Sequence, residues 1–132
     1  VLDSCAPYIS SWVIVDTGST DGTQDVIKDH MARLGIPGEL HERPWRNFGH
    51  NQTEAMGLAQ GHGDYRLWMD ADDVFFGTPD FTQLSADIYM LRVGGDFTYW
   101  RPQLIASRLP VRCVGVIHAA LTCDEPNVEW AR

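Results

Sequence analysis

The chain has 132 residues and a formal net charge of −8 at pH 7, a size that suits one domain. Hydrophobic residues make up 44% and charged residues 21% of the sequence, which excludes wholesale disorder. No apolar run is long enough to span a bilayer, and the acidic balance repels the phosphate backbones of nucleic acids. We therefore expect a single domain, residues 1–132, with no transmembrane segment and no nucleic-acid partner.

The first part of the chain predicts a strand followed by a helix. Residues 12–16 (WVIVD) form a short apolar run that ends in an acid, as a buried strand does. The segment 16–23 (DTGSTDGT) is dense in turn residues, and Asp21 with Gln24 predicts a capping pair at the start of the helix. Apolar residues then recur at helical spacing until Gly35, which predicts the end of the helix.

Strands and helices continue to alternate before residue 76. The pattern predicts a strand at 38–43, a helix at 49–60 and a strand at 65–69. This alternation is typical of an α/β domain with a mostly parallel sheet. The remainder is short and β-rich, with predicted strands at 87–93, 97–100, 103–107 and 111–117. We expect that part to form a small mixed or antiparallel extension of the sheet.

The three cysteines, Cys5, Cys113 and Cys123, are odd in number and include no C-x-x-C pair. This favours free thiols in a reducing compartment, and hence a cytoplasmic location. Cys113, His118 and Cys123 can also be drawn as a zinc site, but their spacing fits no usual zinc pattern.

Acidic residues gather where two predicted strands end. Asp16 closes the first strand, and Asp70, Asp72 and Asp73 follow the strand at 65–69. The carboxyl ends of parallel strands share one edge, and ligands bind in the crevice above it. Carboxylate oxygens there suit Mg²⁺ or Mn²⁺, with substrate phosphates completing the shell. The alternative interpretation is a solvated loop with helix-capping acids.

The two acidic segments, taken in order, resemble the motifs of family-2 glycosyltransferases, which have the glycosyltransferase A fold. DTGSTDGT at 16–23 and DADD at 70–73 are the specific part of this resemblance. Residues 45–51 (WRNFGHN) look like the stretch before the family's nucleotide-side helix, and 114–118 (VGVIH) like its late glycine-x-x-histidine segment. The resemblance covers the chain from about Val1 to Cys123.

The resemblance implies a Rossmann-like α/β fold whose first half, 1–76, binds a nucleotide sugar and whose second half, 77–132, faces the acceptor. Asp16 would contact the base or ribose, and Asp70 the ribose or sugar. Asp72 would bind the divalent metal, Mn²⁺ or Mg²⁺, and His118 would lie near the metal or the acceptor. The implied reaction moves a sugar from a nucleoside diphosphate sugar to an acceptor hydroxyl with inversion. The catalytic base is unknown: Asp73, Asp124 and Glu125 are the nearby acids, and none is assigned.

Three departures from the family pattern bear on activity. The family has a central strand before the point where this sequence begins, so the resemblance is to a short, N-terminally truncated form. Gln52 stands where such enzymes usually have arginine, and Ala119 where glutamate commonly follows the histidine. These departures favour an alternative, an inactive or partner-dependent glycosyltransferase-like nucleotide-binding module. We expect the gap in the sheet to be closed either by pairing of 12–15 with 65–69 or by a segment from a second chain, which makes a homodimer.

A rival class shares part of the second motif. LWMDADDV at 67–74 also fits the start of haloacid-dehalogenase-type phosphatases, with Asp70 as the nucleophile. That chemistry needs a lysine later in the chain, and none follows Lys28.

Overall fold

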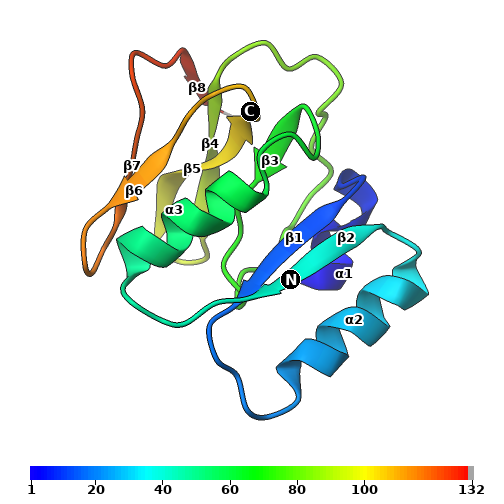
Figure 1. Ribbon diagram of the computed structural model, residues 1–132. Coiled ribbons are helices and arrows are strands. Elements are labelled where there is room, and N and C mark those ends of the chain that lie inside the picture. Colours follow the sequence, from blue (N-terminus) through cyan, green and yellow to red (C-terminus); the bar gives the residue numbers. More distant parts are fainter. Residues whose placement is uncertain (131–132) are drawn as a thin grey trace.

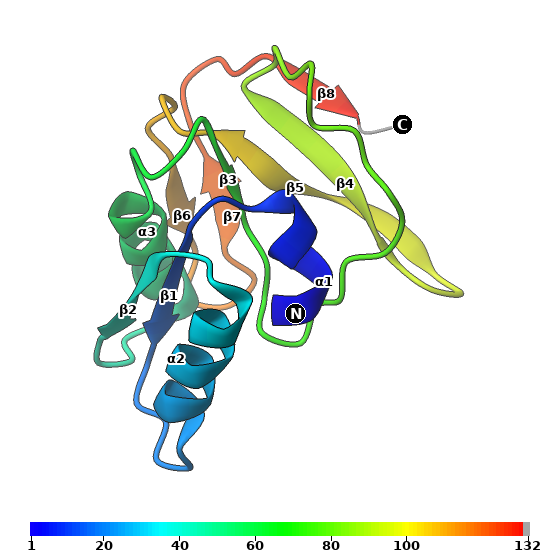
Figure 2. The ribbon, with the colours of Figure 1, turned by 90° about the vertical axis from the view of Figure 1, so that its right-hand side faces the viewer.

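The structure is a computed structural model that describes residues 1–130. Within that range the strands form three small sheets, whose arrangement with the helices is shown in Figures 1 and 2. The chain opens with the short helix α1 (Leu2–Cys5) and one 3₁₀ turn, η1 (Ala6–Tyr8). No helix in residues 1–130 is long and apolar enough to cross a membrane.

The first sheet pairs two parallel strands joined by a helix. Strand β1 (Trp12–Asp16) lies beside β2 (Gly38–Glu42), in register from Trp12 opposite Gly38 to Asp16 opposite Glu42. Helix α2 (Thr23–Leu34) connects them and places Met31 in the interior with 1% of its surface exposed. The helix ends at Gly35, whose positive φ of 68° suits a residue without a Cβ. The predicted strand, helix and strand are confirmed here.

The second sheet has the strand order β3-β5-β4-β8. Its members are β3 (Tyr65–Leu67), β4 (Ile88–Gly94), β5 (Thr98–Ala106) and β8 (Val128–Trp130). Strand β5 runs antiparallel to both β3 and β4, and only β8 is parallel to its neighbour β4. One face packs against helix α3 (Phe48–Leu58) through Met56, Ile88 and Ile105.

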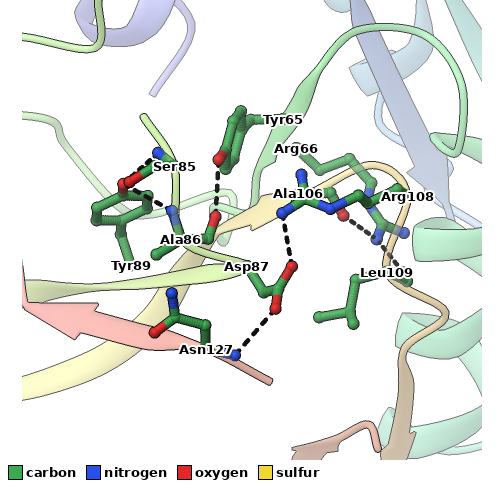
Figure 3. A network of polar contacts seen from close by, with 10 residues as sticks. All are labelled: Tyr65, Arg66, Ser85, Ala86, Asp87, Tyr89, Ala106, Arg108, Leu109 and Asn127. Carbon is green, nitrogen blue, oxygen red and sulfur yellow. Dashed lines mark hydrogen bonds and ion pairs between the residues drawn. The ribbon is translucent and has the colours of Figure 1, made fainter. Parts of the chain in front are cut away.

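The opposite face of this sheet carries a second apolar cluster, around Ala86, Tyr89 and Leu104. Figure 3 shows the polar contacts near it. The Tyr89 hydroxyl accepts hydrogen bonds from the backbone N–H groups of Ser85 and Ala86, and the Tyr65 hydroxyl donates to the carbonyl of Ala86. These bonds satisfy the backbone of the segment that leads into β4.

The third sheet is a small antiparallel pair, β6 (Arg112–Val114) with β7 (Ala120–Thr122), that packs on α3. The Thr53 hydroxyl accepts from the backbone N–H of Cys113 at 2.8 Å and donates to its carbonyl at 3.2 Å. In Figure 1 the β6–β7 turn lies beside the start of α3, away from the segment that follows β3.

The expectation of one mostly parallel sheet is wrong for residues 1–130, although the mixed character of the later strands is confirmed. Direct pairing of 12–15 with 65–69 is also wrong, because β1 pairs with β2 whereas β3 pairs with β5. Strand β5 lies between β3 and β4: it pairs with β4 along one edge, and β3 pairs with residues 104–106 along the other. The acids after β1 and after β3 therefore follow strands of different sheets.

Smaller differences concern the later strands. The segments predicted at 97–100 and 103–107 form the single strand β5, and the one predicted at 111–117 is shortened to β6. Residues 124–132 show no clear period, yet 128–130 form β8 beside β4. Residues 131 and 132 lie outside the described range.

Candidate functional site

The loop after β1 is organised around the carboxylate of Asp16. Only 6% of Asp16 is exposed, and its Oδ2 accepts hydrogen bonds from the backbone N–H groups of Gly18 and Ser19 at 3.0 and 2.9 Å. The side-chain amide of Gln24 donates a third bond to the same oxygen at 2.9 Å. The three donors fix the carboxylate and leave Oδ1 to face other partners.

This geometry corrects the predicted capping pair. Asp21 accepts from the backbone N–H and the hydroxyl of Thr23, whereas the Gln24 amide bonds Asp16 and the carbonyl of Ser19. The residue before the helix is Gly22, and no side chain there caps it. Gln24 therefore closes the loop after β1 and does not reach back to Asp21.

The same contacts set the ionisation of Asp16. Hydrogen bonding by Ser19, helped by Gly18 and Gln24, outweighs the effect of burial and lowers the pKa of Asp16. A carboxylate with a lowered pKa stabilises the fold fully above its unfolded pKa of about 3.9, and this stabilisation is lost as the pH falls through the folded pKa.

We therefore expect Asp16→Asn to lower the free energy of unfolding by about 1–2 kcal/mol at pH 7. This difference in the free energy of unfolding should become smaller as the pH falls below about 4, where the wild-type carboxylate becomes protonated. Urea unfolding between pH 2 and pH 7 measures both. Asp29→Asn, which removes an exposed carboxylate of α2, is the matched control. A difference in the free energy of unfolding that stays constant from pH 2 to pH 7 would contradict a stabilising role of the Asp16 charge.

The second acidic segment, Asp70–Asp73, is held by two side chains of β5. Asp70 donates its backbone N–H to the Asp73 carboxylate at 3.0 Å, and its carbonyl accepts from the Asp73 N–H at 3.1 Å. Arg101 reaches Oδ2 of Asp70 at 2.8 Å and Oδ2 of Asp73 at 3.6 Å. Gln103 donates to Asp73 at 3.3 Å and to the carbonyl of Trp68 at 3.2 Å.

A β-bulge in β5 turns Arg101 toward these acids. Tyr89 lies opposite Leu104 but Met90 lies opposite Pro102, so Gln103 is one extra residue on β5. Without that residue, alternation would place Arg101 on the face of Ile105, toward α3. With it, Arg101 lies opposite Leu91 on the other face.

Arg101 and Gln103 were not among the site residues expected from the sequence. The signal that could have found them is Pro102, because a proline inside a strand marks an edge or a bulge. The ion pairs tie down Asp70 and Asp73, whereas Asp72 between them is exposed. Asp72 is thus the exposed acid of this loop that Arg101 does not hold, whereas the Asp70 side chain is paired although 43% of it is exposed.

The backbone N–H groups at the start of α3 are hydrogen-bonded within the chain. The Asn47 side chain accepts from the backbone N–H of His50 at 2.8 Å. The N–H groups of Phe48 and Gly49 donate to the carbonyls of Val116 and Gly115. Because these donors are satisfied, this helix start offers a phosphate little of the usual helix N-terminal site.

His118, the second predicted metal ligand, lies in the β6–β7 turn and is exposed, with a positive φ of 55°. Within residues 1–130, no group of three His, Cys, Asp or Glu residues is placed to hold a metal ion. The described chain therefore does not provide a complete protein cage around Asp72 or His118. The same finding counts against the zinc site drawn from Cys113, His118 and Cys123, whose thiols are unpaired.

Comparison with known families identifies the chain. The family described as glycosyl transferase family 2 matches residues 7–84, which run from η1 through both acidic loops. The chain therefore belongs to the family-2 glycosyltransferases, as the sequence motifs predicted, and the family implies a glycosyltransferase-A-like α/β fold. The match ends before β4, so the segment containing His118 lies outside it. No curated protein and no solved structure matches the chain.

Proposed function

We propose that the protein transfers a sugar from a nucleoside diphosphate sugar to an acceptor hydroxyl, with a divalent metal and with inversion at the anomeric carbon. The observation that carries the proposal is the loop at 70–73, inside the family match. There Arg101 fixes Asp70 and Asp73 while Asp72 stays exposed. Such a loop can present one fixed and one solvent-facing carboxylate to the same ligand.

Asp16 and Asp70 are suited to bind the nucleotide and the sugar. Asp16 has Oδ1 available to accept a hydrogen bond from the base or ribose, because its three internal bonds fall on Oδ2. Asp70 binds Arg101 through Oδ2 and would accept a ribose or sugar hydroxyl through its other oxygen. Both contacts are of the carboxylate-to-hydroxyl kind, which is stronger than a neutral hydrogen bond.

The residues fit a metal that takes few protein ligands. Asp72 supplies a hard oxygen of the kind that Mg²⁺ and Mn²⁺ prefer, and such ions commonly keep one or two carboxylates with phosphate oxygens and water. We propose Asp72 as the principal ligand. The β6–β7 turn that carries His118 lies beside the start of α3 and away from the Asp70–Asp73 loop, so we propose His118 as an acceptor-side contact rather than as a second ligand. When bound, the metal would neutralise charge that develops on the leaving diphosphate.

In the proposed reaction the acceptor oxygen attacks the anomeric carbon from the face opposite the diphosphate. The carbon–oxygen bond to the diphosphate breaks with its electron pair, and the acceptor proton passes to a carboxylate base. The contacts of Asp73 with Asp70, Arg101 and Gln103 all fall on Oδ2 and leave its Oδ1 to accept a proton. Asp73 and the exposed acids Asp124 and Glu125 are the candidates, and the base is not assigned.

We expect binding of a nucleoside diphosphate to depend on the metal, because a chain at −8 presents little positive charge to a diphosphate. Calorimetry with UDP and GDP should show binding with Mn²⁺ or Mg²⁺ that is lost in excess chelator and in Asp72→Ala. Asp29→Ala, on an exposed position of α2, should bind like the wild type. Equal affinity with and without chelator would overturn the metal dependence.

The alternative is an inactive or partner-dependent nucleotide-binding module, and one observation favours partner dependence. Strand β1 pairs with β2 on one edge, and within residues 1–130 no strand pairs with its other edge. Residues 12–15 are only half-buried, although they form an apolar run. An unpaired apolar strand edge is a template for another chain, so we propose a homodimer that covers it.

If the protein forms this dimer, its mass in solution depends on the protein concentration. Light scattering over a dilution series should show a mass that falls from twice that of the chain toward that of the chain. Amide hydrogen exchange at 12–16 should accelerate on dilution, because the second edge of β1 loses its partner. A monomer at every concentration, with exchange at 12–16 unchanged, would exclude the dimer.

We also propose that residues 1–76 bind the nucleotide sugar and that residues 77–132 face the acceptor. A cytoplasmic location is proposed from the three cysteines, which are free thiols, as is usual in a reducing compartment.

A further inference from the structure

Two aromatic rings lie exposed at the end of the β4–β5 hairpin. Phe97 is 79% and Tyr99 44% exposed. Their ring centroids are 6.3 Å apart and the planes differ by 29°, so the two rings are stacked with nearly parallel faces. In Figure 2 this end of the hairpin extends beyond the rest of the ribbon. Exposed apolar groups gathered in this way indicate a binding surface.

The two rings continue the face that carries Arg101. Tyr99 and Arg101 are two residues apart on β5, both before the bulge at Gln103, and lie opposite Val93 and Leu91 of β4. Residues two apart on a strand share a face and are about 7 Å apart. Arg101 in turn binds Asp70 at 2.8 Å. The aromatic pair therefore leads along one strand face to the acids of the proposed donor site.

The chemistry of this surface favours a neutral saccharide. The rings offer flat apolar faces on which the C–H face of a sugar can stack, and the Tyr99 hydroxyl adds a hydrogen-bonding edge. The charged groups nearby are Asp96 in the hairpin turn, Arg101, which is already paired with Asp70 and Asp73, and Arg92. Arg92 lies opposite Trp100, so strand alternation places it on the other face of the hairpin. Among the described residues, the face that carries Tyr99 and Arg101 therefore offers an anionic ligand no unpaired cation.

We propose that Phe97 and Tyr99 form a stacking platform for a neutral saccharide acceptor, whose hydroxyl is presented toward the Asp70–Asp73 loop. The acceptor role rests on the proposed glycosyltransferase function, whereas the binding of a saccharide to the platform does not. The opposite face of the hairpin provides a contrast, because Trp100 and Trp130 meet there edge to face at 90° and form no flat pair.

The test is a titration of the purified chain with neutral oligosaccharides, followed by NMR. Maltohexaose, cellohexaose, xylohexaose and mannohexaose serve as probes, and UDP with Mn²⁺ is titrated separately. Phe97→Ala and Tyr99→Ala should each weaken binding of the preferred oligosaccharide by about five- to tenfold, the scale of one aromatic contact. Tyr99→Phe, which keeps the ring, should stay within about twofold of the wild type.

Trp130→Ala removes an exposed tryptophan from the other face and should leave saccharide affinity unchanged. Thermal unfolding checks that all four variants remain folded, and UDP affinity should not change in any of them.

The platform would be overturned if no probe bound, or if Trp130→Ala weakened binding as much as the platform variants. It would also be overturned if Phe97→Ala and Tyr99→Ala changed self-association or vesicle binding without changing saccharide affinity. Saccharide binding without any UDP binding would leave the platform standing and remove the proposed function.

Discussion

Gly49→Ala is expected to lower the free energy of unfolding by about 2–3 kcal/mol. A Cβ at this position would lie 2.6 Å from the carbonyl oxygen of Gly115 and 2.9 Å from that of Cys113. Both are backbone atoms, so the added methyl group has to push β6 away from α3. Overpacking of this kind costs about 1–3 kcal/mol, and the hydrogen bond from Gly49 N–H to Gly115 would weaken as well.

The same helix supplies a matched control. A Cβ at Gly57 meets nothing within 4 Å, so Gly57→Ala gains the helix propensity of alanine without a clash. We expect it to raise the free energy of unfolding by about 0.5–1 kcal/mol. Urea unfolding of the two variants should thus give effects of opposite sign. Two stabilising effects would show that the turn yields easily and that α3 and β6 are not tightly packed at Gly49.

This contact also positions the predicted acceptor-side histidine. Gly115 and Val116 bind the start of α3, and His118 follows two residues later with a positive φ. If His118 takes part in metal or acceptor binding, Gly49→Ala should weaken that binding as well as the fold. The glycine is therefore both a packing residue and a positioning residue for the β6–β7 turn.

The sequence predicted the elements that depend on local patterns. The strand at 12–16, the helix ending at Gly35 and the strand at 38–42 each have their own periodicity and end signals. The family was predictable for the same reason, because its two acidic motifs are contiguous in the sequence. Asp16 was found as a site candidate, but its bond to Gln24 was not, because that bond depends on how the loop folds back.

The arrangement of the later strands could not be predicted from the same patterns. Strand β3 has only three residues, and nothing in Tyr65–Leu67 indicates whether its partner is β1 or β5. The partner of the DADD acids was missed because alternation would place Arg101 on the face toward α3, and only the bulge at Gln103 reverses it. A register shift of one residue thus decided the composition of the candidate site.

Arg66 was missed for a related reason, since a charged residue in a strand indicates a solvent-facing position. It is in fact 7% exposed, and its guanidinium donates to the carbonyls of Met56, Ala106 and Leu109 at 2.9, 3.1 and 2.7 Å. Figure 3 shows its contacts with the turn after β5. The Met56 carbonyl belongs to the last turn of α3, where the helix dipole favours a cation. Burial lowers the pKa of Arg66, and its hydrogen-bond partners are these backbone carbonyls rather than a carboxylate.

Arg66→Met should therefore lower the free energy of unfolding by about 2–4 kcal/mol. The methionine fills much of the space but removes the guanidinium donor from the carbonyls of Met56 and Leu109, whereas the carbonyl of Ala106 still accepts from the N–H of Leu109. An unsatisfied buried acceptor costs about 1–3 kcal/mol. The gain from no longer burying a charge offsets part of this loss. Arg108→Met is the control, because that side chain is 61% exposed and pairs with Asp87 at the surface, where an ion pair contributes about 0–1 kcal/mol. If Arg66→Met proved as stable as the wild type in urea, the guanidinium would not be what joins the end of α3 to β3 and β5. With the expected loss, Arg66 is the polar link between the helix and the sheet that carries Arg101 and, through it, the acidic loop.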